Sequence, residues 1–192
     1  MDPMNNLLLE HIARYQFSIS YAYGRVLDIA SGSGYGTQLI AKVCKGQVSE
    51  VVGADNSAEA VEYARGRYYH PLTNFVEADV LDNSLRKKLG TFDTILSFET
   101  IEHVEDDKLF MENMYSLLND KGILILSTPF GEGKGKPCGE PFHCHQFTEE
   151  EFSGLFKAFS SVEFFYQKSV LIEPVPGREG ADYPLGIAVA RK

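Results

Sequence analysis

The sequence predicts an α/β fold: a doubly wound, seven-stranded sheet that is mostly parallel and ends in an antiparallel C-terminal strand. Three observations predict it. Apolar runs of strand length alternate with helical patterns along most of the chain, which is typical of parallel sheets. The first run leads directly into a glycine-rich turn. The last two runs have no helical pattern between them, so we expect them to be antiparallel. The seven runs cover residues 26–29, 48–55, 74–80, 92–98, 122–129, 162–166 and 185–190.

The length of 192 residues, with 44% hydrophobic and 12% aromatic content, predicts a single packed domain over residues 1–192. A net charge of −9 argues against a nucleic-acid partner, because phosphate binding relies on clustered lysine and arginine. The first ten residues carry Asp2 and Glu10, so we expect no signal peptide. No segment approaches the ~20 apolar residues that span a bilayer. The three cysteines do not suggest a disulfide framework. We therefore predict a cytoplasmic protein without a membrane partner.

Residues 1–24 precede the first strand, and we expect them to form a covering helix. Apolar side chains recur at Leu8, Ile12 and Tyr15, which is helical spacing. This helix is expected to pack over the sheet edge or over the mouth of a ligand site.

The glycine turn after the first strand predicts a cofactor cradle. Gly32 and Gly34 allow left-handed backbone angles and the close approach of a ligand. The helix that follows, over residues 37–43, offers unpaired N–H groups at its start. Nicotinamide and flavin enzymes also use glycine-rich turns, so the turn alone does not identify the cofactor. Asp28 narrows the choice, because a carboxylate in the first strand suits an ammonium group and would repel a pyrophosphate.

The stretch from Asp28 to Gly36, DIASGSGYG, resembles the first motif of the class I S-adenosylmethionine-dependent methyltransferases, with Ala30 in place of the first motif glycine. The resemblance covers residues 25–192 and looks most like a bacterial branch with poorly defined substrates. It implies a Rossmann-like fold with S-adenosyl-L-methionine as cofactor. That branch carries a similar His-x-x-Arg-Tyr phrase before the first strand. The phrase implies that Arg14 and Tyr15 touch the methionine end of the cofactor, and a plain covering helix is the alternative.

An acidic residue also ends the second strand. Asp55 follows Gly32 at close to the ~20-residue offset at which a carboxylate reaches ribose hydroxyls. The alternative is that residues 55–57 only cap the next helix, although Ser57 can provide that cap by itself.

By the same resemblance, Asp79 accepts a hydrogen bond from the adenine amino group and Val80 contacts the ring, whereas Asp82 is expected to cap a short helix over residues 83–88. Ligands in an open parallel sheet bind beyond the carboxyl ends of the strands, so acids at four successive strand ends point to one site. The residues expected to bind the cofactor are Asp28, Ala30, Gly32, Gly34, Tyr35, Asp55, Asn56, Asp79, Val80, Phe98, Glu99 and Tyr15.

Methyl transfer needs mainly an aligned acceptor, and it needs a base only where the acceptor must lose a proton. The expected catalytic residues are His143, His103 and Glu99, and Glu102 and His145 are further candidates. The Glu-x-x-Glu-His spacing resembles a catalytic cluster of some small-molecule N-methyltransferases. The alternative role for His103 is to fix the turn after the fourth strand.

Segment 131–147 is too long for a simple connection, and it combines glycines with histidines. We expect a substrate lid in which His143 contacts the substrate or acts as a base. Cys138, Cys144 and His145 could join His143 around a metal ion. Adjacent ligands fit one tetrahedron poorly, so we predict no metal site.

These patterns predict S-adenosylmethionine-dependent methyl transfer to a small-molecule or sugar-linked acceptor, bound by residues 1–24, 131–147 and 173–184. The alternatives are a catalytically inactive cofactor-binding protein and a nicotinamide-dependent oxidoreductase. Aromatic residues 164–166 fit either a dimer contact or a core strand. The protein is therefore expected to be a monomer or a homodimer.

Overall fold

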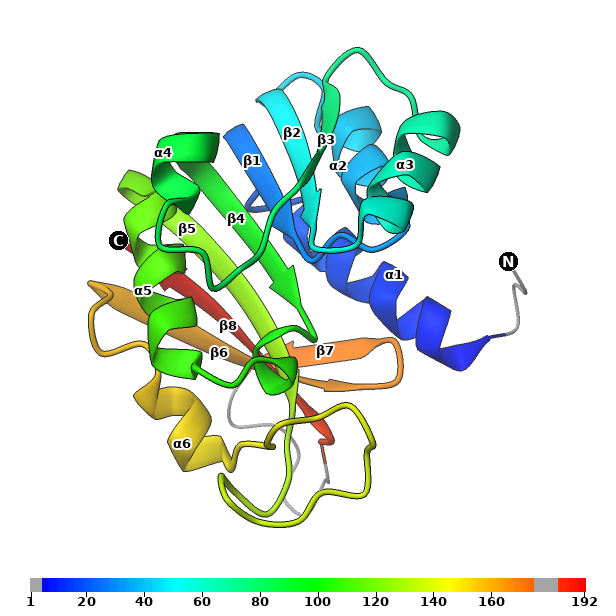
Figure 1. Cartoon of the computed structure of the whole chain (residues 1–192). Helices are drawn as coiled ribbons and strands as arrows, with labels where there is room; N and C mark the ends of the chain where they lie inside the picture. Colours follow the sequence, from blue (N-terminus) through cyan, green and yellow to red (C-terminus); the bar gives the residue numbers. More distant parts are fainter. Residues whose placement is uncertain (1–4, 175–182) are drawn as a thin grey trace.

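The structure is a computed structural model that describes residues 5–174 and 183–192. In these ranges one sheet holds eight strands in the order β3-β2-β1-β4-β5-β8-β6-β7 (Figure 1). Strands β1 to β5 are parallel to one another, whereas β8 is antiparallel to β5 and β6, and β7 is antiparallel to β6. The strands are β1 Gly24–Ile29, β2 Val48–Asp55, β3 Thr73–Glu77, β4 Phe92–Phe98, β5 Leu118–Pro129, β6 Ser161–Lys168, β7 Leu171–Pro174 and β8 Leu185–Arg191.

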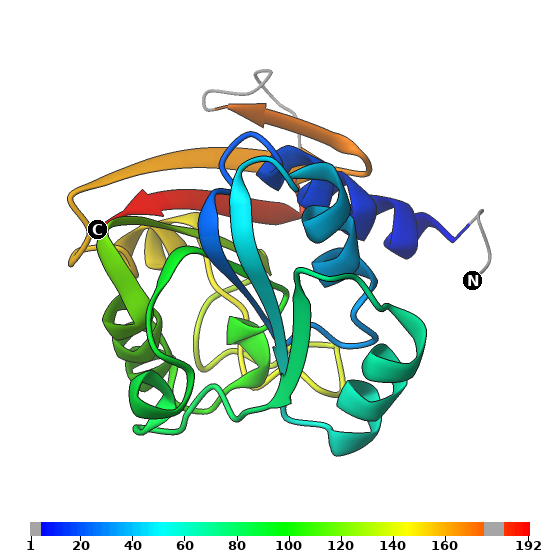
Figure 2. The same ribbon diagram turned by 90° about the horizontal axis from the view of Figure 1, so that it is seen from above.

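Helices cover both faces of the sheet (Figure 1, Figure 2). Residues of α1 and α2 belong to one core, and residues of α4, α5 and α6 belong to the core on the other face. None of the helices in the described ranges combines the length and apolar character needed to cross a bilayer. The helices are α1 Asn6–Ser18, α2 Tyr35–Val43, α3 Ala58–Arg67, α4 Leu85–Leu89, α5 Asp107–Leu117, α6 Glu149–Gly154 and the 3-10 turn η1 Ile101–His103.

The central strand β1 is buried because its alternate side chains enter different cores. Val26 belongs to the same core as Ile40 of α2, whereas Leu27 belongs to the other core together with Phe110 of α5. This two-sided burial explains why the strand is a continuous apolar run. Asp28 lies two residues after Val26, so it points to the same face, toward α1 and α2.

The eighth strand corrects the expectation of seven. β7 begins just before segment 173–184, which is rich in proline and glycine and which the sequence predicts to be irregular. The strand lies at the sheet edge and pairs only with β6. Its last residue, Pro174, is tolerated there because proline lacks an N–H and an edge strand has no second neighbour to which it would donate. The four residues of β7 are too few to show the alternation of apolar and polar side chains that predicts a strand. Residues 175–182 of the expected acceptor loop lie outside the described residues.

The antiparallel pairing of the last two expected strands is confirmed, because β6 and β8 pair along their length. Phe164 and Phe165 of β6 pack against opposite cores. Their aromatic character therefore has an explanation within the chain, and the oligomeric state stays a prediction.

The expected N-terminal helix corresponds to α1, which Asn5 caps by accepting a hydrogen bond from the Leu8 N–H at 3.3 Å. Residues 1–4 lie outside the described residues. Gly36 on α2 determines how closely α1 approaches, because a Cβ there would lie 1.9 Å from the Tyr15 ring. Phe98 contacts that ring edge-on, with centroids 5.0 Å apart, so the ring has little room to retreat.

We predict that Gly36→Ala lowers the free energy of unfolding by about 1–3 kcal/mol, because the added methyl group overpacks the contact between α1 and α2. Urea denaturation of the purified protein measures this change.

Gly66→Ala on α3 is the matched control, because a Cβ at this second helical glycine meets nothing within 4 Å. The control is expected to leave stability unchanged or to raise it by up to about 1 kcal/mol. Equal effects of the two substitutions would contradict the close approach of α1 to α2.

Candidate functional site

A cavity of about 220 Å³ lies at the C-terminal edge of the parallel strands. The turns after β1, β2, β3 and β4 all contribute to it, as expected for a ligand site in an open parallel sheet. Ala30, Asn56, Val80 and Glu99 are expected cofactor residues, and His103 is an expected catalytic residue. The complete lining is Ala30, Asn56, Ala78, Val80, Glu99, Thr100, His103 and Val104.

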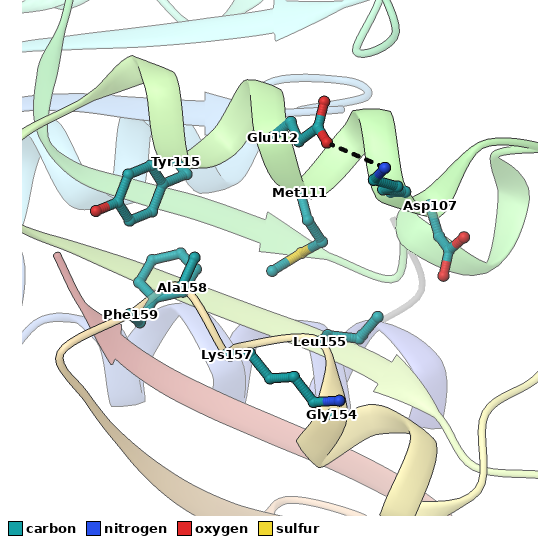
Figure 3. Close-up of a pocket in the computed structure, with 10 residues that line it drawn as sticks. Asp107, Met111, Glu112, Tyr115, Gly154, Leu155, Lys157, Ala158 and Phe159 are labelled. Carbon is teal, nitrogen blue, oxygen red and sulfur yellow. Dashed lines mark ion pairs between the residues drawn. The ribbon is translucent and has the colours of Figure 1, made fainter.

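A larger apolar groove of about 490 Å³ lies between α5 and the segment after α6. Figure 3 shows Met111 and Tyr115 of α5 facing Leu155 and Phe159 across this groove. None of the residues expected from the sequence to bind or react lines it. We therefore place the candidate site at the smaller cavity, where ionisable groups and the glycine turn meet.

The glycine turn has the backbone that its sequence predicts. Ala30, Gly32 and Gly34 have positive φ angles of 56°, 54° and 85°. Ala30, which replaces a motif glycine, therefore adopts a conformation that is strained for a residue with a Cβ. Gly34 is the N-cap of α2 and offers no side-chain acceptor, so the first N–H groups of α2 are left for a ligand.

Asp28 is a buried carboxylate that joins three elements. It is 1% exposed and accepts hydrogen bonds from the hydroxyls of Tyr15 on α1 at 3.0 Å and Thr37 on α2 at 2.6 Å. Burial raises the pKa of Asp28 to about 6, against the effect of both hydroxyl bonds. Two expected cofactor residues, Tyr35 and Phe98, contact the Tyr15 ring edge-on. Thr37 is not among the site residues expected from the sequence, which indicates only that it lies on α2.

Asp55 connects the end of β2 to the glycine turn. Its Oδ2 atom accepts a hydrogen bond from the Gly32 N–H at 2.7 Å, and its Oδ1 atom accepts one from the Ser57 N–H at 2.9 Å. The Ser57 hydroxyl in turn accepts from the Ala60 N–H and caps α3, as expected. The neighbouring Asn56 is exposed and lines the cavity. Capping therefore does not require the Asp55 carboxylate, which lies against the turn.

Asp79 is exposed and accepts a hydrogen bond from the backbone N–H two residues later, while Val80 lines the cavity. Asp82 organises the next turn: the hydrogen bond from Lys88, together with those from the Ser84 N–H and hydroxyl, lowers the pKa of Asp82 to about 2. The N-cap of α4 is Ser84, so Asp82 is not the cap that the sequence predicts.

Glu99 is held by side chains of α1. Arg14, which is 1% exposed, pairs with Glu99 and donates a second hydrogen bond to Gln167 Oε1 on β6 at 2.8 Å. His11 Nε2 lies 3.7 Å from Oε2 of Glu99. Burial acts to raise the pKa of Glu99, but the hydrogen bond from His11 and the charge of Arg14 outweigh it and hold the pKa below its usual value. Glu99 is thus an ionised group whose charge is already paired.

Glu102 anchors segment 131–147 to η1. Its backbone carbonyl accepts hydrogen bonds from the N–H groups of Cys144 and His145 at 2.8 and 3.4 Å. Its side chain is fully buried, and Oε2 accepts from the Thr128 hydroxyl at 2.9 Å. Oε1 has no hydrogen-bond partner among the described residues. Burial raises the pKa of Glu102 to about 8.

His103 and His143, two expected catalytic residues, lie together with ring centroids 4.8 Å apart. His103 Nδ1 lies 2.9 Å from the carbonyl oxygen of Phe142. Because a carbonyl only accepts, His103 donates from Nδ1, and in the neutral ring this leaves the lone pair on Nε2. Burial lowers the pKa of His143, which favours its neutral form. Glu99, the third expected catalytic residue, shares the cavity lining with His103.

The metal set considered from the sequence does not assemble. Among the described residues, the group suited to a metal ion is instead Glu102, His103 and His143, whose ligand atoms lie within 4.8 Å of one another. The thiols of Cys138 and Cys144 are hydrogen-bonded to backbone carbonyls. The sequence does not indicate that Glu102 and His103 of η1 lie beside His143 of segment 131–147.

Comparison with known proteins identifies the family. A family model described as a methyltransferase domain matches residues 22–158. A protein of Mycobacterium tuberculosis, described as a probable S-adenosylmethionine-dependent methyltransferase, is 31% identical over 134 residues, which are 68% of this chain and 46% of that protein. A ubiquinone biosynthesis O-methyltransferase of Chelativorans sp. is 35% identical over 107 residues, or 54% of this chain and 40% of that enzyme.

Solved structures share the fold. The N-methyltransferase NodS of Bradyrhizobium japonicum, in complex with S-adenosyl-L-homocysteine, superimposes with a TM-score of 0.69 at 17% identity, covering 100% of this chain and 89% of NodS. A SAM-dependent methyltransferase of Archaeoglobus fulgidus gives a TM-score of 0.69 at 15% identity, covering 98% of this chain and 95% of the other.

The chain spans about half the length of the mycobacterial relative and less of the ubiquinone enzyme. The matched family region nevertheless contains the glycine turn, the strand-end acids and the whole of segment 131–147. The chain therefore belongs to the class I S-adenosylmethionine-dependent methyltransferases, with S-adenosylmethionine as cofactor, as its glycine motif predicts.

Proposed function

We propose that this protein transfers the methyl group of S-adenosyl-L-methionine to a small-molecule or sugar-linked acceptor. The observation that carries the proposal is the single cavity that extends from Ala30 and Asn56, beside the glycine turn, to His103 beside the lid. Methyl transfer requires cofactor and acceptor to be aligned in one space from which water is excluded. The net charge of −9 favours a small acceptor over a nucleic acid.

In this proposal, residues at different strand ends bind different parts of the cofactor's nucleoside. Gly32 and Gly34 accommodate the cofactor at the turn, where they leave backbone N–H groups accessible. Asp55 accepts hydrogen bonds from the ribose hydroxyls, assisted by Asn56. Its carboxylate is already held beside the turn by the Gly32 N–H. Asp79 and Val80 bind the adenine, and Val80 forms part of the cavity wall.

The methionine end lies, in this proposal, over Asp28. The buried carboxylate gives the region beneath the turn a negative charge that attracts the cofactor ammonium. Tyr15 and Thr37 fix the orientation of this carboxylate through their hydroxyls. Arg14 is already bonded to Glu99 and Gln167, so we assign it the role of holding α1 over the cavity.

The acceptor atom attacks the methyl carbon, and the carbon–sulfur bond breaks with its electron pair remaining on sulfur. Acceptors that must lose a proton need a base near the cavity. His103 has a lone pair on Nε2, and burial favours the neutral form of His143, so either imidazole can accept that proton. Glu99 is paired with Arg14 and His11, which suits it to orienting groups at the cavity wall.

Two alternatives to methyl transfer predict different ligand-binding results. A cofactor-binding protein without turnover would bind S-adenosylhomocysteine but methylate nothing, and the paired histidines argue against it. A nicotinamide-dependent oxidoreductase would bind NAD. All the relatives and structures named above are described as methyltransferases, which favours methyl transfer. The cytoplasmic location and the monomeric or homodimeric state stay predictions.

We predict that the protein binds S-adenosylhomocysteine with micromolar affinity and that Asp55→Ala weakens binding by about tenfold or more, because two ribose hydroxyls lose a charged acceptor. Isothermal titration calorimetry measures both affinities. A separate titration with NAD tests the oxidoreductase alternative.

Asp82→Ala is the matched control, because this acid also follows a strand but is bonded to Ser84 and Lys88. Its affinity for S-adenosylhomocysteine is expected to equal that of the wild type. Tight binding of NAD, or equal losses in both variants, would contradict the proposed site.

A second prediction concerns pH. Because burial raises the pKa of Asp28 to about 6, this carboxyl is mostly neutral below that pH, and the neutral form attracts an ammonium group less. Affinity for S-adenosylhomocysteine is expected to fall by up to about tenfold per pH unit below pH 6 and to level off above it. Calorimetry between about pH 5 and pH 8 measures this profile.

In Asp28→Asn the profile is expected to flatten, because the neutral amide does not titrate. Asp93→Asn is the control, since Asp93 lies at the opposite end of β4 and is bonded to Arg25 and Asn119. A pH profile unchanged in Asp28→Asn would exclude Asp28 as the group that attracts the ammonium.

A further inference from the structure

We propose that Glu102, His103 and His143 bind one divalent transition-metal ion at the acceptor end of the cavity. Their ligand atoms lie within 4.8 Å of one another, although two of the residues belong to η1 and the third to the lid. Metal–ligand bonds of about 2.0–2.2 Å require these atoms to approach a little more closely.

Two of the proposed ligands have buried atoms without a partner. Oε1 of Glu102 and Nδ1 of His143 are shielded from solvent and make no hydrogen bond within the described residues. Glu102 itself is 0% exposed. Buried polar atoms are nearly always paired, because leaving one unpaired costs about 1–3 kcal/mol. A cation between these atoms would provide the partner that both lack.

In the third ligand, His103, a hydrogen bond to segment 131–147 determines which ring nitrogen can bind a metal ion. The Phe142 carbonyl oxygen accepts from Nδ1–H, which leaves the lone pair of Nε2 for a metal ion. Metal-binding histidines typically donate their other N–H to a carbonyl or carboxylate in this way. Thr128 plays the corresponding part for Glu102, since its hydroxyl donates to Oε2 and orients the carboxylate.

The ligand types indicate which ions fit. Two imidazoles and one carboxylate suit zinc, iron(II), cobalt or manganese, whereas magnesium and calcium prefer sets made of oxygen alone. Three protein ligands leave at least one coordination position open. His103 also lines the cavity, so that position is available to an acceptor oxygen.

The consequence for the reaction rests on the proposed function. With the ion bound, both imidazoles would be ligands and would no longer accept the acceptor's proton. The cation would take over that role, because it lowers the pKa of a coordinated hydroxyl. That hydroxyl releases its proton to water, its oxygen attacks the methyl carbon, and the carbon–sulfur bond breaks with its electron pair remaining on sulfur. The site therefore fits hydroxyl acceptors, especially those with a second oxygen close enough to occupy another coordination position.

The test is a titration of untagged, chelator-treated protein with Co²⁺, followed by calorimetry and by the visible absorption of the ion. We expect one Co²⁺ per chain with micromolar affinity. His103→Ala and His143→Ala are each expected to weaken binding by about tenfold or more, because each removes one of three protein ligands. His70→Asn is the matched control: this histidine lies between α3 and β3, and its Nδ1 accepts from the Leu72 N–H.

Binding of S-adenosylhomocysteine, measured without metal, shows whether each variant is folded and tests the cofactor site separately. Loss of Co²⁺ binding in the two folded variants, with His70→Asn unchanged, would support the site. Absence of Co²⁺ binding to the wild type, or equal affinity in all variants, would overturn it. Binding that is lost in His145→Ala but kept in His103→Ala would overturn it in favour of the cysteine-containing loop.

Discussion

The buried carboxylate of Asp28 is the constraint on which the site depends. It lies at the end of β1, directly before the glycine turn, and it accepts hydrogen bonds from Tyr15 on α1 and Thr37 on α2. A buried carboxylate without such partners would be strongly unfavourable, so both helices must be in place when the strand is packed. The absence of a Cβ at Gly36 allows the Tyr15 ring to reach this position. One acid thus fixes how closely two helices approach the strand beneath the glycine turn.

Peripheral segments are joined to this centre by polar contacts. Arg14 pairs with Glu99 after β4 and with Gln167 on β6, and so connects α1 to two parts of the sheet. Glu102 accepts backbone hydrogen bonds from segment 131–147, which brings His143 of that segment to His103. The His103 side of the cavity is therefore built from elements that are remote in sequence.

The parts of the site that the sequence reveals are those formed by contiguous residues. The glycine turn and Asp55 belong to one strand–turn–helix unit and its successor, so their spacing carries the information. Gln167 gives no such sign, because 153 residues separate it from Arg14. The grouping of Glu102 with His143 depends on how segment 131–147 folds back, which no local period encodes. The edge strand β7 is too short to show alternation, and for that reason the expected strand number was one too low.

The most direct test of this account is a crystal structure of the protein with S-adenosylhomocysteine. The account predicts the ligand at the strand ends, with its ribose on Asp55, its adenine against Val80 and its sulfur on the His103 side of the cavity. A ligand bound instead in the apolar groove between α5 and the segment after α6 would contradict it. So would a ribose that makes no contact with Asp55, since the cofactor would then bind by another arrangement than the one derived from the strand-end acids.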